Sequence, residues 1–204
     1  MKKVLVSCAA ILLALCIGTG AAYAWYTYVY RGTLNGISIQ PTEAASSDLG
    51  VNSSVTGTFQ SYVSLGQSAT LSPATSTDGV NFKDKNGASS TQYVAVNGYV
   101  KAPADTSTFR ISEIRVAGED EINKALRVKV TFNGETHIYA PVSGADGNLS
   151  ICTPVGTDFS TGLTKDTPSL VNIVVWYEGT DSSCTSANAN TASGAGISLI
   201  VEAE

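Results

Sequence analysis

The sequence predicts an all-β fold, an antiparallel β-sandwich preceded by an N-terminal hydrophobic signal helix. Beyond residue 24, short β-rich runs separated by Gly, Asn, Asp and Pro recur to the end of the chain, and no long stretch has apolar residues at helical spacing. Charged residues make up only 14% of the chain, while Thr, Ser, Asn and Gly are abundant, as is typical of extracellular β proteins. These observations favour a sandwich or a barrel.

The first 24 residues have the layout of a secretory leader. Two lysines follow the initiator methionine, and residues 4–24 contain no charged side chain. Ala22 and Ala24 supply the small residues that a signal peptidase needs, so we expect a cut before Trp25 that leaves 180 residues, which is 204 minus 24. The alternative is an uncleaved membrane anchor, because the apolar run is long enough to cross a hydrocarbon core of roughly 30 Å.

We therefore divide the chain into the leader 1–24, an N-terminal aromatic strand segment 25–40 and a sandwich domain 41–204. Without the two leader lysines, 10 of the 12 basic residues remain against 17 acidic ones, a net charge near −7. Such a charge disfavours nucleic acid as a partner. We expect a secreted protein, at the cell surface or in the extracellular matrix, that contacts the membrane only through its leader.

Nine runs predict the strands. In chain order they cover 25–30, 33–40, 92–101, 108–116, 126–132, 135–139, 148–152, 170–177 and 196–202. Asn133-Gly134 predicts a tight hairpin turn, because both residues accept positive φ. The run 126–132 alternates apolar and polar residues, which predicts one wet face, whereas 170–176 is nearly continuous in apolar residues and predicts a central strand covered on both sides.

One helix and two loops are predicted from the charges at the helix ends and from composition. One short helix is expected over 118–125, where Glu119, Asp120 and Glu121 suit the positive end of a helix. Residues 64–91 and 180–195, rich in turn-forming and small polar residues, are predicted to be loops.

The aromatic segment that begins at the expected new N-terminus is the most unusual local feature. As a strand it places Trp25, Thr27 and Val29 on one face and Tyr26, Tyr28 and Tyr30 on the other. It either pairs within its own domain, forms a membrane-interface belt if the leader is retained, or is donated to a neighbouring molecule.

Two of the four cysteines, Cys8 and Cys16, lie in the leader, so Cys152 and Cys184 remain. We expect these two to form a disulfide, which in the chain-entropy model stabilises by roughly 3 to 4 kcal/mol for a loop of this length. The alternative is two unpaired thiols. No metal centre is expected, since two distant cysteines and one histidine cannot supply four close ligands.

Few residues suggest catalysis, and neither a catalytic residue nor a cofactor is expected. His137 is the only histidine and is predicted to be an exposed strand residue; a hydrolase would need it, or two facing acids, and the acids at 119–121 are better explained as a solvated helix start. Four aspartates lie in or near Gly-containing turns, where either calcium or ordinary turn chemistry explains them: Asp78, Asp84, Asp146 and Asp181.

Three segments carry a family resemblance: residues 22–27 (AYAWYT), 71–82 (LSPATSTDGVNF) and 174–184 (VVWYEGTDSSC). They resemble exported Gram-positive proteins whose leader is cut by a dedicated signal peptidase, a group that includes TasA-like biofilm-matrix fibre subunits and camelysin. The resemblance implies a jelly-roll-like sandwich displayed on the surface or polymerised in the matrix. It further implies that Trp25–Tyr30 of one subunit completes the sheet of the next.

The sequence departs from that group in two respects. Camelysin relatives are often called metallopeptidases, but this chain has no histidine pair to hold zinc, so that activity is not carried over. The pair Cys152 and Cys184 also departs from TasA.

Two functions therefore remain as expectations. The first is an extracellular structural protein that assembles with itself by N-terminal strand addition. The second is a monomeric cell-surface binding module, for carbohydrate or a host surface, that uses exposed aromatic residues. Candidate aromatics are Tyr62, Tyr93, Tyr99 and Tyr139.

Overall fold

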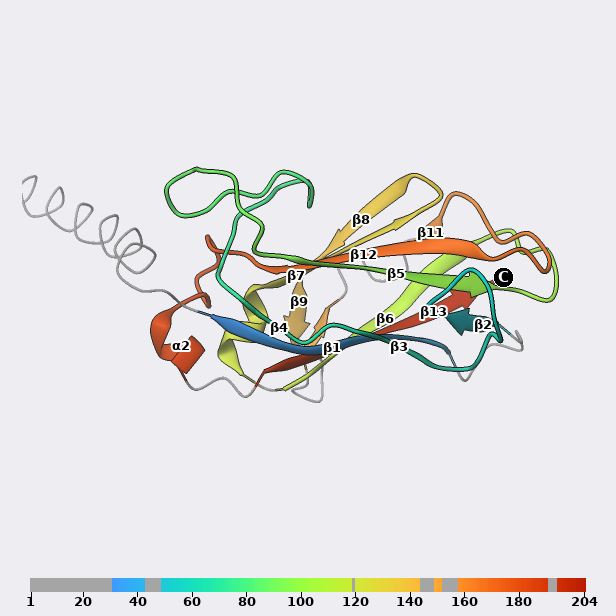
Figure 1. The fold of residues 1–204 in the computed structure, drawn as a ribbon, viewed down its shortest axis with the longest axis horizontal. Helices are drawn as coiled ribbons and strands as arrows, with labels where there is room; N and C mark the ends of the chain where they lie inside the picture. The colour runs from blue at the N-terminus through green and yellow to red at the C-terminus, as the bar shows by residue number, and fades with distance from the viewer. Residues whose placement is uncertain (1–30, 43–48, 119, 144–148, 152–157, 191–193) are drawn as a thin grey trace, which may run out of the picture.

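The structure is a computed structural model that describes residues 31–42, 49–118, 120–143, 149–151, 158–190 and 194–204. Within these residues the chain forms two β-sheets that pack face to face, with two short helical segments at one end (Figure 1). The predicted all-β class is confirmed. The expected leader helix and the expected strand 25–30 lie outside the described residues.

The first sheet, sheet A, has the strand order β3-β1-β13-β6-β10-β9, with β4 also beside β1 and β11 beside β6. Its strands are β1 (Gly32–Pro41), β3 (Val63–Gly66), β4 (Ala69–Leu71), β6 (Phe109–Ala117), β9 (Pro141–Ser143), β10 (Leu149–Ile151), β11 (Asp158–Phe159) and β13 (Ala195–Ala203). The first and last strands, β1 and β13, run parallel, with Ile37 opposite Ile197. The expectation of a purely antiparallel sandwich is wrong at this pair, because both strands enter the sheet from the same end.

The second sheet, sheet B, has the order β2-β5-β12-β7-β8 and is antiparallel throughout. It consists of β2 (Gly50–Asn52), β5 (Val94–Lys101), β12 (Ser169–Tyr177), β7 (Leu126–Phe132) and β8 (Glu135–Tyr139). The hairpin between β7 and β8 is confirmed: Asn133 has φ 48° and Gly134 has φ 84°, both in the left-handed region that this two-residue turn requires.

The core lies between the sheets and is built from alternate residues of each strand. On β12, Val171, Ile173 and Val175 are fully buried and face sheet A. Three phenylalanines from β6, β7 and β11 meet in this core, with ring centroids 4.3 to 5.6 Å apart. Rings at this separation pack favourably, so they tie the two sheets together.

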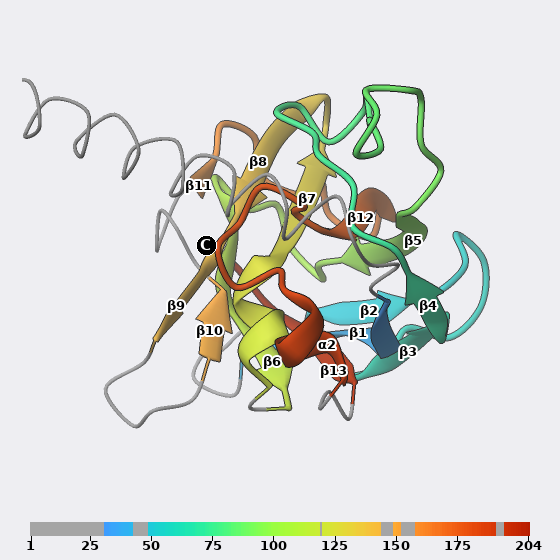
Figure 2. The same ribbon diagram turned by 90° about the vertical axis from the view of Figure 1, so that its left-hand side faces the viewer.

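The outer face of sheet B is covered by the long segment between β4 and β5. In Figures 1 and 2 this segment, in green, lies outside β12 and β7. Val174 and Trp176, on the outer face of β12, pack against Ala74 and Phe82 of the segment in a second, smaller apolar cluster. The prediction that this strand is covered on both sides is confirmed.

The same cover overturns the expected wet face of β7. Lys129 points outward but is only 8% exposed, and its Nζ donates a hydrogen bond to the Gly79 carbonyl oxygen at 3.0 Å. The packing is tight, because a Cβ at position 79 would lie 2.5 Å from the Lys129 Cδ. Local alternation could not reveal a cover that comes from 50 residues away in the sequence.

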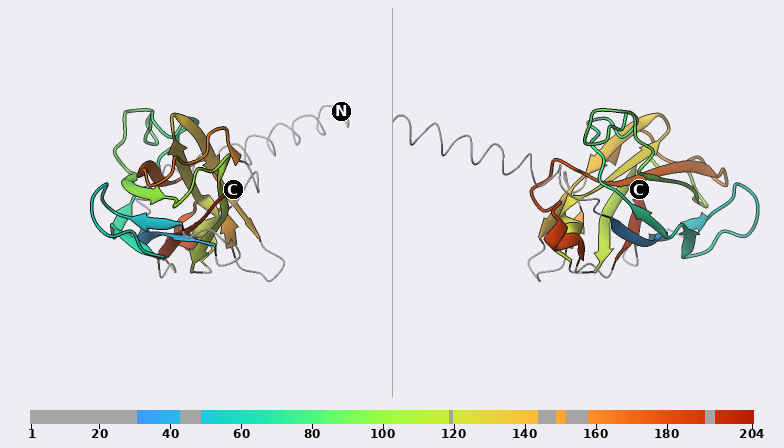
Figure 3. Two further views of the ribbon diagram at one scale, coloured as in Figure 1. Left: turned by 90° about the vertical axis from the view of Figure 1, so that its right-hand side faces the viewer. Right: turned by 60° about the vertical axis from the view of Figure 1, so that its left-hand side comes forward.

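Short elements account for the other differences. The expected loop 64–91 contains most of β3 and all of β4, and the expected loop 180–195 contains the helix α2 (Ser186–Asn190). Strands of two to four residues show no periodic pattern, and β3 and β4 exist because they pair with β1. The expected helix 118–125 is present as the 3-10 helix η1 (Glu121–Ala125), against which α2 packs at the end of the sandwich seen in Figure 3. Neither described helix is long and apolar enough to span a membrane.

Candidate functional site

A buried carboxylate fixes the covering segment to β12. Glu178, directly after β12, is 8% exposed, and one of its oxygens accepts hydrogen bonds from the Trp176 indole N–H at 3.1 Å and from the Ser76 N–H at 3.2 Å. The other oxygen accepts from the Thr180 hydroxyl at 2.8 Å and from the Thr180 N–H at 3.2 Å. Burial raises the pKa of Glu178, but these donors and Thr75 outweigh it and hold the pKa below its ordinary value.

This carboxylate joins two distant stretches of the sequence. The backbone of Ala74 bridges to Glu178, and the Ala74 N–H bonds the Tyr177 carbonyl oxygen at 3.0 Å. Residues 71–82 and 174–184, the stretches that carry the family resemblance inside the described residues, are therefore packed against each other. Both carboxylate oxygens of Glu178 are already occupied by hydrogen-bond donors of the protein, so we assign this residue a structural role.

The start of β1 is anchored in the core by close contact with Tyr177. A Cβ at Gly32 would collide with the Tyr177 ring, so glycine lets β1 pass directly over that ring. The Tyr177 hydroxyl lies 3.3 Å from both the Thr33 carbonyl oxygen and Asn123 Oδ1. Burial, together with nearby Asp120 and Cys184, raises the Tyr177 pKa, so the phenol stays protonated and donates.

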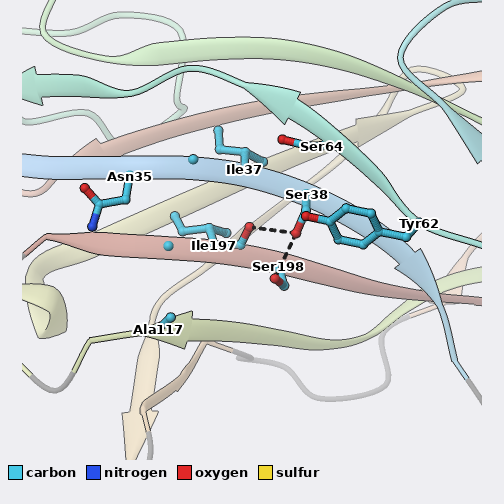
Figure 4. A pocket seen from close by; sticks show the side chains of 10 residues that line it. Asn35, Ile37, Ser38, Tyr62, Ser64, Ala117, Ile197 and Ser198 are labelled. Atoms are coloured by element: carbon cyan, nitrogen blue, oxygen red, sulfur yellow. Dashed lines mark hydrogen bonds between the residues drawn. The ribbon is translucent and has the colours of Figure 1, made fainter.

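A pocket of about 240 Å³ opens on the outer face of sheet A, over β1, β13 and the end of β6 (Figure 4). Its floor is formed by residues with small side chains or none, among them Gly36, Gly196 and Ala117. Tyr62, which is 51% exposed, reaches from the start of β3 toward Ser38. The Ser38 hydroxyl lies 2.8 Å from the Ser198 hydroxyl and 3.4 Å from the Ile197 carbonyl oxygen.

The four candidate tyrosines do not share a face. Tyr139 is 1% exposed and belongs to the core, so its assignment as a surface aromatic is wrong. Tyr93 stacks on Phe82 at 4.4 Å on the outer side of sheet B, where Tyr99 also points, whereas Tyr62 lies on the outer side of sheet A. The period of two along β8 placed Tyr139 on the same side as Glu135, but only the packing of the sheets shows that this side faces inward.

His137 is not the exposed residue that the sequence predicts. Its side chain is 19% exposed, lies edge-on to the Phe159 ring at 4.8 Å, and its Nε2 lies 3.0 Å from Glu135 Oε1. Hydrogen bonds from the Ser160 backbone and hydroxyl, with a smaller contribution from His137, lower the pKa of Glu135. The carboxylate therefore lies between hydroxyl and imidazole, whereas a Ser-His-acid relay needs the imidazole in the middle.

The turn aspartates use their carboxylates on their own loops. Asp78 accepts hydrogen bonds from the N–H groups of Val80 and Asn81, both at 2.8 Å, and these bonds lower its pKa. Asp84 accepts from two backbone N–H groups, and Asp181 accepts from the Ser183 N–H at 2.9 Å while its other oxygen pairs with Arg127 of β7 at 2.7 Å. These contacts support ordinary turn chemistry. Among the described residues, no group of three or more His, Cys, Asp or Glu is arranged to hold a metal ion.

Two of the acidic residues expected at the helix start lie in η1 or directly before it. Glu121 is exposed and its Oε1 lies 2.6 Å from Lys124 Nζ, within η1, while Asp120 occupies the residue before this helix. Glu119 and Asp146 lie outside the described residues.

Several predicted residues also fall outside the described part of the chain: Ala22, Ala24, Trp25, Tyr26, Thr27, Tyr28, Val29, Tyr30 and Cys152. Cys184 is described as a buried free thiol, whose pKa is raised to about 12 chiefly by burial and also by Asp181 and Glu178. Because Cys152 lies outside the described residues, the disulfide between the two stays a prediction.

The chain was compared with protein-family models, with curated proteins and with solved structures. No family model, no curated protein and no solved structure matches it.

Proposed function

We propose that this chain is an extracellular structural protein, a surface or matrix fibre subunit that assembles with copies of itself through the strand Trp25–Tyr30. The leader holds this strand at the membrane until signal peptidase removes it. After the cut, the strand is free to add to a sheet of a neighbouring molecule, where backbone hydrogen bonds supply affinity and alternate side chains supply register.

The observation that carries the proposal is where the pairing of β1 ends. On one side, the antiparallel partner β4 reaches Gly32 with Leu71; on the other, the parallel partner β13 begins at Ala195, opposite Leu34. Within the described residues, the pairing of β1 with both neighbours thus begins at its first residues. In our proposal, the strand upstream of Gly32 takes its backbone partners from a neighbouring molecule.

The position of β1 suits end-to-end assembly. β1 begins at the end of the sandwich where α2 lies, and β13 finishes at the opposite end (Figure 1). The backbone of Gly32 lies directly against the Tyr177 ring, so the first residues of β1 are fixed to the core. A strand that leaves the fold at such an anchored point can transmit tension from one subunit into the next.

We class the sandwich as jelly-roll-like, in keeping with the TasA-like resemblance. The chain crosses repeatedly from one sheet to the other, from β5 to β6 to β7 and again from β12 to β13, as jelly rolls do. Secretion, a biofilm matrix and a dedicated signal peptidase follow from that resemblance and are part of the same proposal.

The test compares the chain that begins at Trp25 with one that begins at Gly32. We expect filaments only from the longer chain, by negative-stain electron microscopy and by sedimentation. A third chain, with Tyr26, Tyr28 and Tyr30 replaced by Ser, keeps the backbone but loses one aromatic face, and we expect it to assemble weakly.

The thermal midpoint and the circular dichroism spectrum of the shorter chain serve as the control. An unchanged fold with no filaments supports strand donation. If both chains form the same filaments, or if neither does, the donated strand is not Trp25–Tyr30 and the proposal fails.

A further inference from the structure

The pocket on the outer face of sheet A has a floor of glycine and alanine, where the pairing of β1 with β13 shifts register between Leu34 and Gly36. Gly196 lies inside β13, where glycine weakens a strand by roughly 0.5–1 kcal/mol relative to alanine. A Cβ at this position would meet one atom within 4 Å, the Ala117 Cβ, at an ordinary contact distance of 3.5 Å. Glycine inside a strand often marks a bulge or a place where a ligand or another backbone approaches closely, and here it also leaves room above the strand.

The walls of the pocket offer an aromatic ring and hydroxyl groups. Tyr62 is half exposed although it stands beside the nearly buried Ser38, so part of its ring is open to a ligand. Ser38 and Ser198 share one hydrogen bond of 2.8 Å. Since each hydroxyl has one donor and two acceptor sites, the Ser198 hydroxyl keeps capacity for a further partner.

The charge and the size of the pocket limit its ligand. No lining residue is charged at neutral pH, so an ionic ligand would find no counter-charge there. The volume of about 240 Å³ is below the roughly 300–1,000 Å³ of sites for drug-sized molecules and suits one sugar ring.

We propose that this pocket binds one neutral hexopyranose unit. The C–H face of the sugar packs on the Tyr62 ring, its edge rests on Gly196 and Ala117, and its hydroxyls bond to the Ser198 hydroxyl. This site is independent of strand donation, because it is formed entirely by residues 35–198 of one folded chain.

The test is saturation-transfer NMR on the chain that begins at Trp25, with glucose, galactose, mannose and N-acetylglucosamine as probes. Neutral oligosaccharides of the same sugars form a second arm, which distinguishes a free sugar from a unit of a polymer. We expect transfer from the protein to the ring C–H protons of at least one sugar.

Three variants locate the binding. Tyr62→Ala removes the stacking ring and Gly196→Val fills the floor, and each should weaken binding roughly tenfold or more. Tyr93→Ala, the matched control, removes a partly exposed tyrosine on the opposite face of the sandwich and should leave binding unchanged. Thermal midpoints show whether each variant is folded; if Gly196→Val does not fold, Tyr62→Ala still decides.

Two results would overturn the proposal. One is no transfer to any sugar or oligosaccharide. The other is equal binding by Tyr62→Ala and the parent chain, which would place the sugar elsewhere. If Tyr62→Ala abolishes filaments while no sugar binds, the pocket is a contact between copies, the sugar proposal fails and self-assembly stands.

Discussion

At the scale of single residues, Glu178 shows how neutral hydrogen-bond donors stabilise a buried charge. Its two oxygens accept hydrogen bonds from an indole, a hydroxyl and two backbone N–H groups. Each bond to a charged acceptor contributes more than a neutral one, about 1.5–3 kcal/mol. The ionised form is therefore favoured in the folded protein, even though burial alone would favour the neutral form.

This residue predicts a specific dependence of stability on pH. The pKa of Glu178 lies below its ordinary value of 4.5 in the folded chain, so the unfolded chain binds its proton first as the pH falls. The stabilisation is complete above the unfolded pKa and is lost as the pH falls through the folded pKa. Glu178→Gln should lower the free energy of unfolding by about 1–3 kcal/mol at neutral pH. It should also make the free energy of unfolding fall less steeply as the pH is lowered into the acid range.

Urea unfolding between about pH 3 and pH 6, followed by Trp176 fluorescence in a Trp25→Phe background, measures both effects. Glu113→Gln, which removes a carboxylate that pairs with Arg115 at the surface, is the control for loss of one charge. If the free energy of unfolding falls equally steeply with decreasing pH in Glu178→Gln and in the parent chain, the carboxylate does not control acid stability.

At the scale of elements, the β7-β8 hairpin is the clearest case in which two residues specify a structure. Asn133 and Gly134 both adopt positive φ, and the five residue pairs from Phe132 opposite Glu135 to Val128 opposite Tyr139 follow in register. The turn matches the twist of the strands, which is why Asn-Gly is favoured there. The apolar face of β7 then fixes which side is buried.

Gly134→Ala tests this account of the hairpin. A Cβ at position 134 would meet nothing within 4 Å, so any loss reflects backbone conformation alone and should be about 1 kcal/mol or somewhat more. Gly196→Ala adds the same methyl group to a residue with extended backbone, where alanine is favoured over glycine, and should not destabilise the protein. Equal free energies of unfolding for the two variants would contradict the role of positive φ.

At the scale of the whole molecule, the protein has a main core and a separate outer layer. The main core lies between the sheets, while the outer layer is the small cluster of Ala74, Phe82, Val174 and Trp176. Phe82 is its centre, since it stacks on Tyr93 and lies edge-on to Trp176 at 5.3 Å. A layer with few apolar contacts should open more easily than the core beneath it.

Phe82→Ala should therefore loosen the outer layer before the sandwich. We expect a loss of about 3 kcal/mol and early amide exchange at Thr75 and Lys83, which bond each other's backbones. The β5-β12 ladder should keep its protection below the global unfolding transition. Val80→Ala, at a side chain that is 64% exposed, is the control, and simultaneous loss of protection in layer and ladder would contradict two separate units.

The sequence by itself determined most of the long strands and one turn. Runs such as 126–132 and 135–139 end at the residues where the structure ends them, because alternation and turn chemistry are local properties of the chain. The nearly continuous apolar run 170–176 likewise predicted burial on both faces.

Only the tertiary structure decided which distant segments meet. The parallel pairing of β1 with β13, the short strands β3 and β4, and the cover that buries Lys129 all depend on partners far away in the sequence. The pocket beside Tyr62 arises in the same way, from small residues on three neighbouring strands. The alternation of residues within a strand determines which side chains share a face. Which segment packs against that face depends on contacts with residues far away in the sequence, and no pattern within the strand specifies them.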